Sequence, residues 1–385
     1  METKKKKMKV LILSCNTGEG HNMAAKAVRE RCAAEGHEAV VLDFLSLGGK
    51  FVSSFISNFY IRSAKYLPNA YGFFYNAMLF VSSILRFGRS IIYILNSRIA
   101  PKLKRFLEEN DFDAVVTTHM FAADALAYLK RRGTVLPPTA MVITDYSWYP
   151  FLQETACDHY ILPHDDLIPL FAKRLPEETL CPFGIPISTR FEHLPTQEEA
   201  RAHLGLASNQ PIYLVMGGSM GAGRIKSFTK KLSQEIQNGE IIVICGKNAR
   251  LKRALEKRLA GHENVRLVGF TDKIPYYMTA CDVLYTKPGG LTSTEALVCH
   301  TPMVHTTPIP GCETDNMKFF RDHGIAIPAK TVKQQIECGK ALAENPERLE
   351  EMRACQRRVA KPDSAKDVVR LLEESVAQRE AADQP

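Results

Sequence analysis

Three segments of the chain combine a predicted β-strand, a glycine-containing turn and a predicted helix, an arrangement that can hold anionic groups. The first is Thr17-Gly-Glu-Gly-His21, which follows the apolar run after Lys9. We expect Gly18 and Gly20 to let the backbone turn sharply, with His21 at or near a helix amino terminus. The positive end of that helix disfavours an imidazolium ion, so His21 should be neutral near neutral pH and able to act as a general base.

Two other interpretations of this turn stay open. His21 can simply cap the turn without any chemical role. A dinucleotide site is the other alternative, since Asp43 ends the second predicted strand where a ribose-binding acid would stand. The turn lacks the third glycine of G-x-G-x-x-G, which disfavours NAD.

The second segment is Gly217-Gly-Ser-Met-Gly-Ala-Gly-Arg224, again between a strand and a helix. Its backbone N–H groups suit a phosphate or diphosphate at the positive end of the helix. It is not a Walker A loop, because Lys226-Ser227 comes too late, inside the helix. Alone, the glycine cluster fits a tight turn as well as an anion site.

The third segment, Thr286-Lys-Pro-Gly-Gly-Leu-Thr-Ser-Thr-Glu-Ala296, contains the most specific pattern. Thr292 and Glu295 are spaced as in a capping box, in which each satisfies a free N–H group of the other. In the functional interpretation, Glu295 accepts two hydrogen bonds from a ribose diol while Gly289 and Gly290 face a diphosphate. Two phosphate-type turns and one diol-type acid in one domain favour a nucleotide-sugar site.

The elements that position these residues alternate between short apolar runs and helical stretches, which is typical of parallel sheets with crossover helices. Two series of strands are expected: 9–15, 38–44, 113–119, 139–146 and 159–162, then 211–219, 240–246, 265–269, 282–287 and 302–305. Residues 181–210 contain four turn-favouring residues, Pro182, Gly184, Pro186 and Pro195, and a short helical stretch near 198–204, and we place the domain junction there. The predicted division is 1–180, the junction, 211–330, and C-terminal helices over 331–385. In such α/β domains ligands bind at the carboxyl ends of the strands.

Length and composition exclude a mini-domain and a disordered or low-complexity chain. The 385 residues, 45% hydrophobic and 24% charged, are typical of a globular chain of two or three domains. Half of the net charge of +8 comes from the lysine-rich amino terminus, and the remaining +4 is too small to indicate nucleic acid by itself. Ten cysteines without a C-x-x-C pair suit reduced thiols in a cytosol, and no signal peptide is recognisable.

One segment departs from the α/β pattern. Residues 44–107 contain nine basic residues, no acidic residue and twelve aromatic residues between 51 and 93. A packed helical excursion is one interpretation. An anionic membrane surface is the other, with Arg62, Lys65, Phe73, Phe74, Arg86 and Arg89 as candidate contacts. Nucleic acid is disfavoured because no recognised nucleic-acid module accompanies the segment. We expect a peripheral protein on the inner face of the cell membrane, because residues 66–85 are interrupted by proline, glycine and asparagine.

In these motifs the chain resembles the processive diacylglycerol glycosyltransferases of the monogalactosyldiacylglycerol synthase type, relatives of the peptidoglycan N-acetylglucosaminyltransferase. The resemblance covers roughly residues 9–323. It rests on motifs in order: Gly18-x-Gly20-His21, Thr144-Asp145, Gly184-Ile-Pro186, Gly217-Gly218-Ser219, Gly246-Lys-Asn248, Gly269-Phe270, Pro288-Gly-Gly-x-Thr-x-x-Glu295, and Pro308-Ile-Pro-Gly311 with Glu313 and Asn316. It implies a GT-B fold, with two Rossmann-like domains facing across a cleft.

The resemblance also implies roles for particular residues. His21, the preceding glycines and Asp145 would act on the acceptor. The donor residues would be Gly218, Ser219 and Arg224 at the diphosphate, Gly269 and Phe270 at uracil, Glu295 at ribose, and Glu313 with Asn316 at the sugar. Many relatives carry a histidine shortly after Thr-Asp, whereas this chain reads Thr144-Asp-Tyr-Ser-Trp-Tyr-Pro150, and Cys312 stands where many have glutamine.

The expected reaction is a single inverting displacement from UDP-glucose or UDP-galactose to diacylglycerol. His21, or Asp145, would remove the proton of the lipid hydroxyl. No D-x-D-like carboxylate pair is convincingly placed for Mg²⁺, so no metal and no cofactor are expected, and helix amino termini with Arg224 would stabilise the leaving UDP. Three alternatives stay open: N-acetylglucosamine transfer to a lipid-linked peptidoglycan precursor, a UDP-N-acetylglucosamine 2-epimerase, and a membrane-binding nucleotide sensor.

Overall fold

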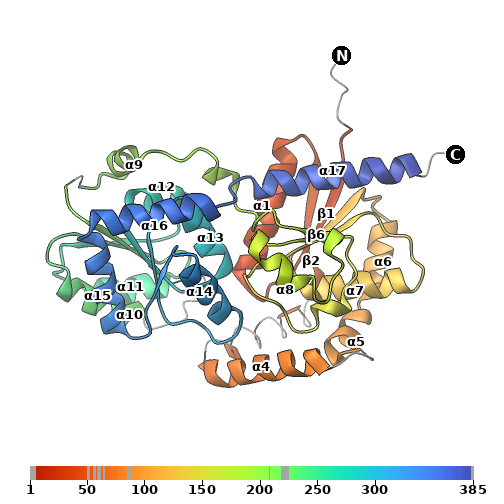
Figure 1. The fold of residues 1–385 in the computed structure, drawn as a ribbon, viewed down its shortest axis with the longest axis horizontal. Coiled ribbons are helices and arrows are strands. Elements are labelled where there is room, and N and C mark those ends of the chain that lie inside the picture. Colours follow the sequence, from red (N-terminus) through yellow and green to blue (C-terminus); the bar gives the residue numbers. More distant parts are fainter. Residues whose placement is uncertain are drawn as a thin grey trace, which may run out of the picture. The chain divides into compact units, whose positions relative to one another are not determined.

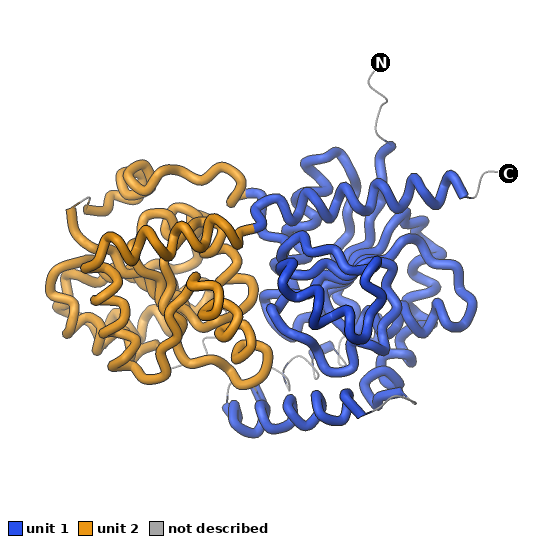
Figure 2. The backbone as a smooth tube through the Cα atoms, in the orientation of Figure 1, with its two compact units in different colours: residues 1–189, 361–385 blue, residues 190–360 orange. Residues whose placement is uncertain are grey.

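The computed structural model describes residues 6–49, 53–54, 58, 62–63, 66–84, 89–207, 209–217 and 225–382. The chain forms two compact units. Unit 1 consists of residues 1–189 and 361–385, and unit 2 consists of residues 190–360 (Figure 2). Each unit is built on a six-stranded sheet in which every recorded strand pair is parallel.

The sheet of unit 1 has the strand order β2-β1-β3-β4-β5-β6. The strands are β1 (Lys9–Ser14), β2 (Glu38–Asp43), β3 (Ala114–Thr117), β4 (Thr139–Val142), β5 (His159–Ile161) and β6 (Leu180–Cys181). β1 pairs with β2 on one side, Lys9 opposite Glu38, and with β3 on the other, Val10 opposite Ala114. The strand order reverses at β1, and open α/β sheets bind ligands where this reversal occurs.

Unit 2 repeats this plan with the strand order β12-β11-β10-β7-β8-β9. The strands are β7 (Ile212–Met216), β8 (Glu240–Ile244), β9 (Val265–Val268), β10 (Val283–Thr286), β11 (Met303–His305) and β12 (Ile327–Pro328). The order reverses at β7, which lies between β8 and β10. The two turns with the strongest phosphate pattern follow β7 and β10, so both lie at this reversal.

All ten strands expected from the sequence are present, each within the predicted range. Two more are found, β6 and β12, which have two residues each. Two residues cannot display an alternating or continuous apolar pattern, so these edge strands leave no recognisable signal in the sequence.

Helices cover both faces of the sheet in unit 1. The helices described in this unit are α1 (Glu19–Ala34), α2 (Phe44–Leu47), α4 (Pro68–Ile84), α5 (Ile91–Ser97), α6 (Ala100–Glu108), α7 (Met120–Arg131), α8 (Ile168–Phe171) and α17 (Ser364–Ala382). Alternate residues of β1 face opposite sides of the sheet. Val10 and Ile12 belong to the cluster with α1 and α17, whereas Leu11 and Leu13 belong to the cluster with α6 and α7.

The last helix belongs to unit 1, although its sequence follows unit 2. The sequence division grouped residues 331–385 as one C-terminal segment, and the structure divides this segment at residue 360. Val368, Val369 and Leu372 of α17 are at most 1% exposed and pack with Val28 of α1. Figure 1 shows α17 alongside α1. The burial of this apolar stripe on a distant part of the chain explains the difference.

The helices of unit 2 are α9 (Gln197–Leu204), α10 (Ile225–Glu235), α11 (Ala249–Arg258), α12 (Ile274–Ala280), α13 (Gly290–Val298), α14 (Cys312–Asp322), α15 (Val332–Ala343) and α16 (Pro346–Val359). One buried cluster joins Val215 of β7 and Tyr285 of β10 to α10, α11, α15 and α16. Two capping boxes do occur in this unit, between Thr196 and Glu199 at the start of α9 and between Thr331 and Gln334 at the start of α15.

Candidate active site

His21 lies in the first turn of α1, as the sequence predicts. The helix begins at Glu19 with Gly18 as its N-cap, and His21 is half-buried. The expected sharp glycine turn is wrong, because Gly18 has φ −173°, an extended conformation open to any residue, and Gly20 is within the helix. A Cβ atom at Gly20 would meet nothing within 4 Å, and one at Gly18 only the His21 ring at 4.0 Å. A Cβ atom would therefore fit at either position, so neither close packing nor backbone conformation requires glycine there.

The backbone of β3 selects one tautomer of His21. Its Nδ1 atom lies 2.6 Å from the carbonyl oxygen of Thr118, directly after β3. A carbonyl oxygen can only accept, so Nδ1 carries the hydrogen and the Nε2 lone pair is left to take a proton. Burial lowers the pKa of His21 to about 4, while the bond to Thr118 opposes this shift. The expected neutral imidazole thus owes its state mainly to burial.

The other candidate base, Asp145, is linked to His21 by two hydroxyl groups. Thr144 Oγ1 lies 3.1 Å from His21 Nδ1 and 3.1 Å from the Tyr149 hydroxyl oxygen. The Tyr149 hydroxyl donates to Asp145 Oδ2 at 3.2 Å and accepts from the Thr144 N–H at 3.0 Å. The two candidates therefore belong to one hydrogen-bonded group at the carboxyl ends of β1, β3 and β4.

A second histidine, which sequence reasoning missed, supports the turn that carries Thr118. His119 is the N-cap of α7, and its Nδ1 accepts from the Phe121 N–H at 3.2 Å. Its Nε2–H then donates to Thr17 Oγ1 at 2.9 Å. The His119 ring contacts the His21 ring edge-on, 4.7 Å between centroids. Burial lowers the pKa of His119 well below its ordinary value. Its position at the end of the expected strand 113–119 was the available signal.

In unit 2 the helix after β10 begins earlier than the capping-box interpretation requires. α13 starts at Gly290 with Gly289 as its N-cap and has no side-chain cap. Thr292 is the third helical residue and therefore not an N-cap. The Thr292–Glu295 pair consequently cannot form the capping box considered above, since such a box needs Thr292 immediately before the helix.

The carboxylate of Glu295 has no assigned hydrogen-bond donor among the described residues. The residue is half-buried, and no ion pair with it is recorded in the part of the chain that the structure describes. Burial raises its pKa to about 7, and the positive charge of Arg190 opposes this shift. A carboxylate in this state gains from a ligand that donates hydrogen bonds to it.

A charged pair lies beside the N-cap of α13. Lys287 forms an ion pair with Glu313 of α14, and a Cβ atom at Gly289 would lie 3.8 Å from Lys287 Nζ and 3.9 Å from Glu313 Oε1. Glu313 also accepts from the Ile309 N–H at 2.8 Å. Sequence reasoning missed Lys287, although its position directly after β10 was a signal. The carboxylate beside this turn, that of Glu313, is thus paired with an ammonium group.

The remaining predicted donor residues are placed as follows. Asn316 is fully buried, and its amide donates to the Pro288 carbonyl at 3.0 Å, so in this structure it supports the glycine turn. Gly269 follows β9, and Phe270 is 72% exposed with Lys247 Nζ 5.5 Å from its ring centroid. Gly218, Ser219 and Arg224 lie outside the described residues.

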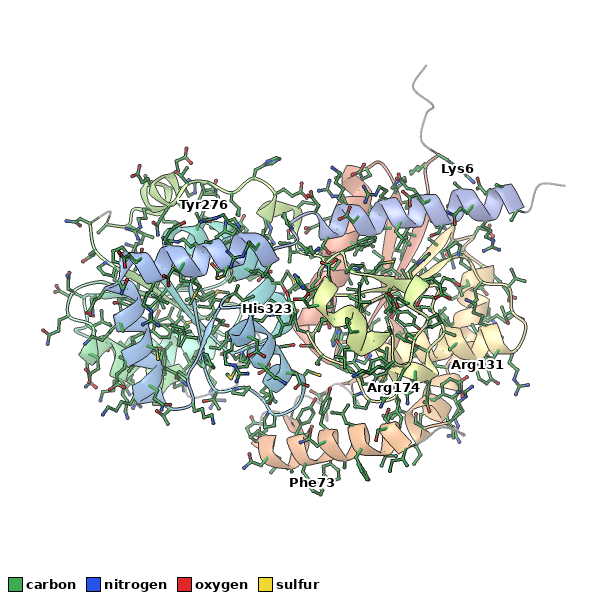
Figure 3. The ribbon with its side chains drawn as sticks, viewed as in Figure 1. Lys6, Phe73, Arg131, Arg174, Tyr276 and His323 are labelled. Atoms are coloured by element: carbon green, nitrogen blue, oxygen red, sulfur yellow. The ribbon has the colours of Figure 1, made fainter. Side chains whose placement is uncertain are left out.

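The aromatic and basic segment forms exposed helices on unit 1. Large apolar side chains of α4 and α5 are exposed, namely Phe73, Phe74, Phe80, Val81, Ile84, Ile91, Ile94 and Leu95. Figure 3 shows Phe73, 71% exposed, projecting from α4. Arg62 and Arg89 are exposed, whereas Lys65 and Arg86 lie outside the described residues. Among the described helices, none is long and apolar enough to cross a membrane.

α4 is attached to the same loop that carries Asp145 and Tyr149. The Tyr75 hydroxyl donates to the Trp148 carbonyl at 3.3 Å, and Ser82 Oγ accepts from the Phe151 N–H at 2.8 Å. Gln153 Nε2 donates to the Ser82 carbonyl at 3.0 Å. The exposed apolar helix is therefore held against the loop after β4, next to the His21 group.

Comparisons with known proteins agree with this arrangement. Residues 21–187 match the monogalactosyldiacylglycerol (MGDG) synthase family, and residues 212–368 match the glycosyltransferase family 28 C-terminal domain. A processive diacylglycerol beta-glucosyltransferase of Staphylococcus saprophyticus is 30% identical over 360 residues, covering 89% of this chain and 87% of the relative. Its counterpart in Bacillus pumilus is 29% identical over 355 residues, covering 90% of this chain and 89% of the relative.

Solved structures show the same fold at low identity. MurG of Acinetobacter baumannii has a TM-score of 0.64 at 16% identity, covering 95% of this chain and 99% of the other. A UDP-GlcNAc 2-epimerase of Neisseria meningitidis has a TM-score of 0.61 at 14% identity, covering 95% of this chain and 100% of the other. These likenesses confirm the predicted GT-B fold with its two Rossmann-like units.

Proposed function

Because the chain belongs to the family of monogalactosyldiacylglycerol synthases and processive diacylglycerol glucosyltransferases, we propose that it transfers glucose from UDP-glucose to diacylglycerol at a membrane surface. The relatives are named beta-glucosyltransferases, which favours glucose over galactose as the transferred sugar. The proposed reaction inverts the anomeric configuration and needs no metal ion. Unit 1 supplies the base and binds the lipid acceptor, and unit 2 binds the donor.

The observation that carries this proposal is the contact between His21 Nδ1 and the carbonyl oxygen of Thr118, which determines the ring nitrogen that can act as base. The Nδ1–H group is bound to the Thr118 carbonyl oxygen, so Nε2 is the basic atom at the reversal point of the unit 1 sheet. The low pKa keeps the imidazole unprotonated at neutral pH. A lipid hydroxyl loses its proton very reluctantly in water, and a positioned base contributes about 10²- to 10⁴-fold to such a step.

The proposed step is one displacement with His21 as base. Nε2 takes the proton from the acceptor hydroxyl, and the oxygen attacks the anomeric carbon with the released electron pair. The new glycosidic bond forms as the bond from that carbon to the UDP oxygen breaks, and UDP departs with the electron pair. The imidazolium proton then passes to water or to UDP, which regenerates the base.

Unit 2 holds the groups that suit the leaving UDP. The free N–H groups at the start of α13 and the Lys287 ammonium group beside Gly289 stabilise negative charge that develops on the diphosphate. Lys287 then performs the role that a metal ion would otherwise have. Glu295, with its unassigned acceptor, binds the ribose hydroxyls, and the loop at Gly269 and Phe270 receives uracil.

The acceptor is proposed to arrive from an anionic membrane through α4 and α5. Their apolar side chains are exposed, and the surrounding segment 44–107 contains no acidic residue. The attachment of α4 to the loop at Trp148 and Phe151 connects this surface to Asp145 and His21. Aromatic and basic residues together favour the headgroup region of an anionic bilayer.

The experiment is a transfer assay with the full chain. Purified protein is incubated with labelled UDP-glucose, UDP-galactose or UDP-N-acetylglucosamine and with vesicles that contain diacylglycerol, a lipid-linked peptidoglycan precursor or neither. We expect labelled glycolipid only from UDP-glucose with diacylglycerol, unchanged by EDTA. Label in a lipid only when a peptidoglycan precursor is supplied, or a modified sugar nucleotide without any lipid, would replace the proposal with a precursor transferase or an epimerase.

A further inference from the structure

The hydrogen-bonded group around His21 contains one residue, Tyr149, whose role none of the assigned functions explains. We propose that Tyr149 is a positioning residue that links the His21 imidazole through Thr144 to the carboxylate of Asp145. This inference rests on the proposed function, since it assigns His21 as the base. It makes Asp145 a partner of that base and not an alternative to it.

The direction of each hydrogen bond follows from the atoms involved. Asp145, when ionised, can only accept, so the single Tyr149 hydroxyl hydrogen goes to Asp145 Oδ2 at 3.2 Å. Tyr149 must then accept from Thr144 Oγ1 at 3.1 Å, as it also accepts from the Thr144 N–H at 3.0 Å. The Thr144 hydroxyl has used its hydrogen, and it therefore accepts from His21 Nδ1–H at 3.1 Å.

The Nδ1–H group of His21 is thus shared by two acceptors, the Thr118 carbonyl oxygen and Thr144 Oγ1. Each donor in this series of hydrogen bonds, from His21 through Thr144 and Tyr149, points toward Asp145, whose carboxylate is the final acceptor. No hydrogen bond has to reverse when Nε2 gains a proton, because Nδ1 keeps its own hydrogen throughout. The chain holds the ring in place and polarises its acceptors toward the imidazolium that forms in the transition state.

The other titratable neighbour does not compete for this role. His119 contacts His21 edge-on, and its own nitrogens are engaged by the Phe121 N–H and by Thr17. Its Nδ1 atom accepts a hydrogen bond, so the ring is neutral and adds no second positive charge beside His21. Asp145 is the group that can balance the imidazolium charge through the chain.

The test compares Tyr149→Phe with a matched control, Tyr160→Phe. Tyr160 lies in the same unit, and its hydroxyl also bonds a threonine hydroxyl, Thr155 Oγ1 at 2.8 Å, and accepts from a backbone N–H, that of Cys157 at 3.1 Å. It has no recorded bond to the His21 group. We expect Tyr149→Phe to lower kcat about tenfold, the factor that corresponds to a change of one pKa unit in the imidazole. The KM for UDP-glucose should stay unchanged. Tyr160→Phe should lower stability and leave kcat unchanged.

Two further variants separate positioning from general packing. Tyr149→His restores one donor and one acceptor, so it should recover a large part of kcat. Because Tyr149 and Asp145 act in one chain, Tyr149→Phe combined with Asp145→Asn should lower kcat little beyond the more affected of the two single variants. Imidazole ¹⁵N shifts at neutral pH should show His21 protonated on Nδ1, whatever the substrate.

The outcomes distinguish this inference from the proposed function. If the wild-type protein makes no glycolipid, the proposed function fails. The ¹⁵N shifts still show in that case which ring nitrogen of His21 carries the hydrogen, and so they still test the hydrogen-bonded series. If the wild type is active while Tyr149→Phe keeps full kcat, or loses no more than Tyr160→Phe, the positioning role is refuted. Additive losses in the double variant, or His21 protonated on Nε2, also overturn it.

Discussion

His21 Nδ1 lies 2.6 Å from the carbonyl oxygen of Thr118, a residue 97 positions later in the chain. This contact connects the first turn of α1 to the end of β3 and determines which ring nitrogen is basic. The carboxyl ends of neighbouring parallel strands meet at one edge of the sheet, so the contact is a direct result of the β1–β3 pairing. The chemistry assigned to unit 1 depends on it.

Replacing His21 with alanine should lower turnover by about 10²- to 10⁴-fold without weakening UDP binding, because the residue acts on the acceptor hydroxyl. Turnover from labelled UDP-glucose and UDP affinity by calorimetry measure the two effects. His159→Ala is the control, since His159 bonds Ser375 of α17 and has no assigned role in the reaction. A His21→Ala variant with near-normal turnover would remove His21 as the base.

Turnover should not decline as pH falls through 6.5, the ordinary pKa of histidine, because burial lowers the pKa of His21 to about 4. The base form persists below neutral pH, and loss of the base is expected only as pH approaches 4. A pH–rate profile with saturating UDP-glucose measures this behaviour. A break at the ordinary histidine pKa that disappears in His21→Ala would contradict the proposed environment of the ring.

Glu295→Ala should weaken UDP binding by about 1.5–3 kcal/mol, since a ribose diol would lose a charged acceptor. The control is Glu199→Ala at the capping box of α9, where the Thr196 N–H donates to Glu199 Oε2 at 2.8 Å. That variant should lower thermal stability and leave UDP affinity unchanged. Calorimetry and thermal unfolding distinguish the two results. A Glu295→Ala protein with lower stability and normal affinity would support a purely structural carboxylate.

Stability should also respond to pH through Glu295. Its pKa is about 7 in the folded chain and near the ordinary 4.5 when unfolded, so between these values the folded state binds more protons. The free energy of unfolding of the wild type, relative to Glu295→Gln, should therefore fall as pH rises from 4.5 to about 7. UDP affinity should rise over the same range, because the ionised carboxylate accepts the diol. Urea unfolding of both proteins at several pH values measures the first trend, and a constant difference would contradict the raised pKa.

Lys287→Met should lower kcat by about 10²-fold, the typical cost of losing one group that stabilises transition-state charge. It should also lower stability, because Glu313 remains partly buried without its partner. The double variant Lys287→Met with Glu313→Gln should recover stability and stay inactive. Lys333→Met, at a lysine whose side chain is 85% exposed, is the control. Recovery of turnover in the double variant would show that Lys287 only neutralises Glu313.

Replacing Phe73 and Phe74 with serine should weaken binding to anionic vesicles about tenfold or more, because each ring contributes roughly 1 kcal/mol or more when it leaves water. The loss should persist at high salt, which screens charges but leaves apolar burial intact. Val135→Ser is the control, since Val135 is 81% exposed elsewhere on unit 1. Sedimentation with phosphatidylglycerol vesicles measures the effect, and equal binding by all three proteins would refute a membrane role for α4.

Much of the fold could be predicted because strands and helices are encoded locally. The apolar run 9–15 and the later runs each predicted a strand, and all ten were found. The position of His21 in the first turn of α1 also followed from neighbouring residues. Two local interpretations were wrong: that Gly18 turns the backbone sharply, and that Thr292 caps α13. Both depended on where a helix begins, and α1 begins at Glu19 and α13 at Gly290.

The sequence by itself determined the two series of strands, the glycine-containing segments after them, and the aromatic and basic segment 44–107, which contains no Asp or Glu. Only the tertiary structure decided which of these elements meet. It placed α17 on unit 1, Lys287 beside Glu313, and Tyr149 between Thr144 and Asp145. Periodicity records which face of an element is apolar, whereas the partner of that face is selected by burial and hydrogen bonding between residues far apart in the chain.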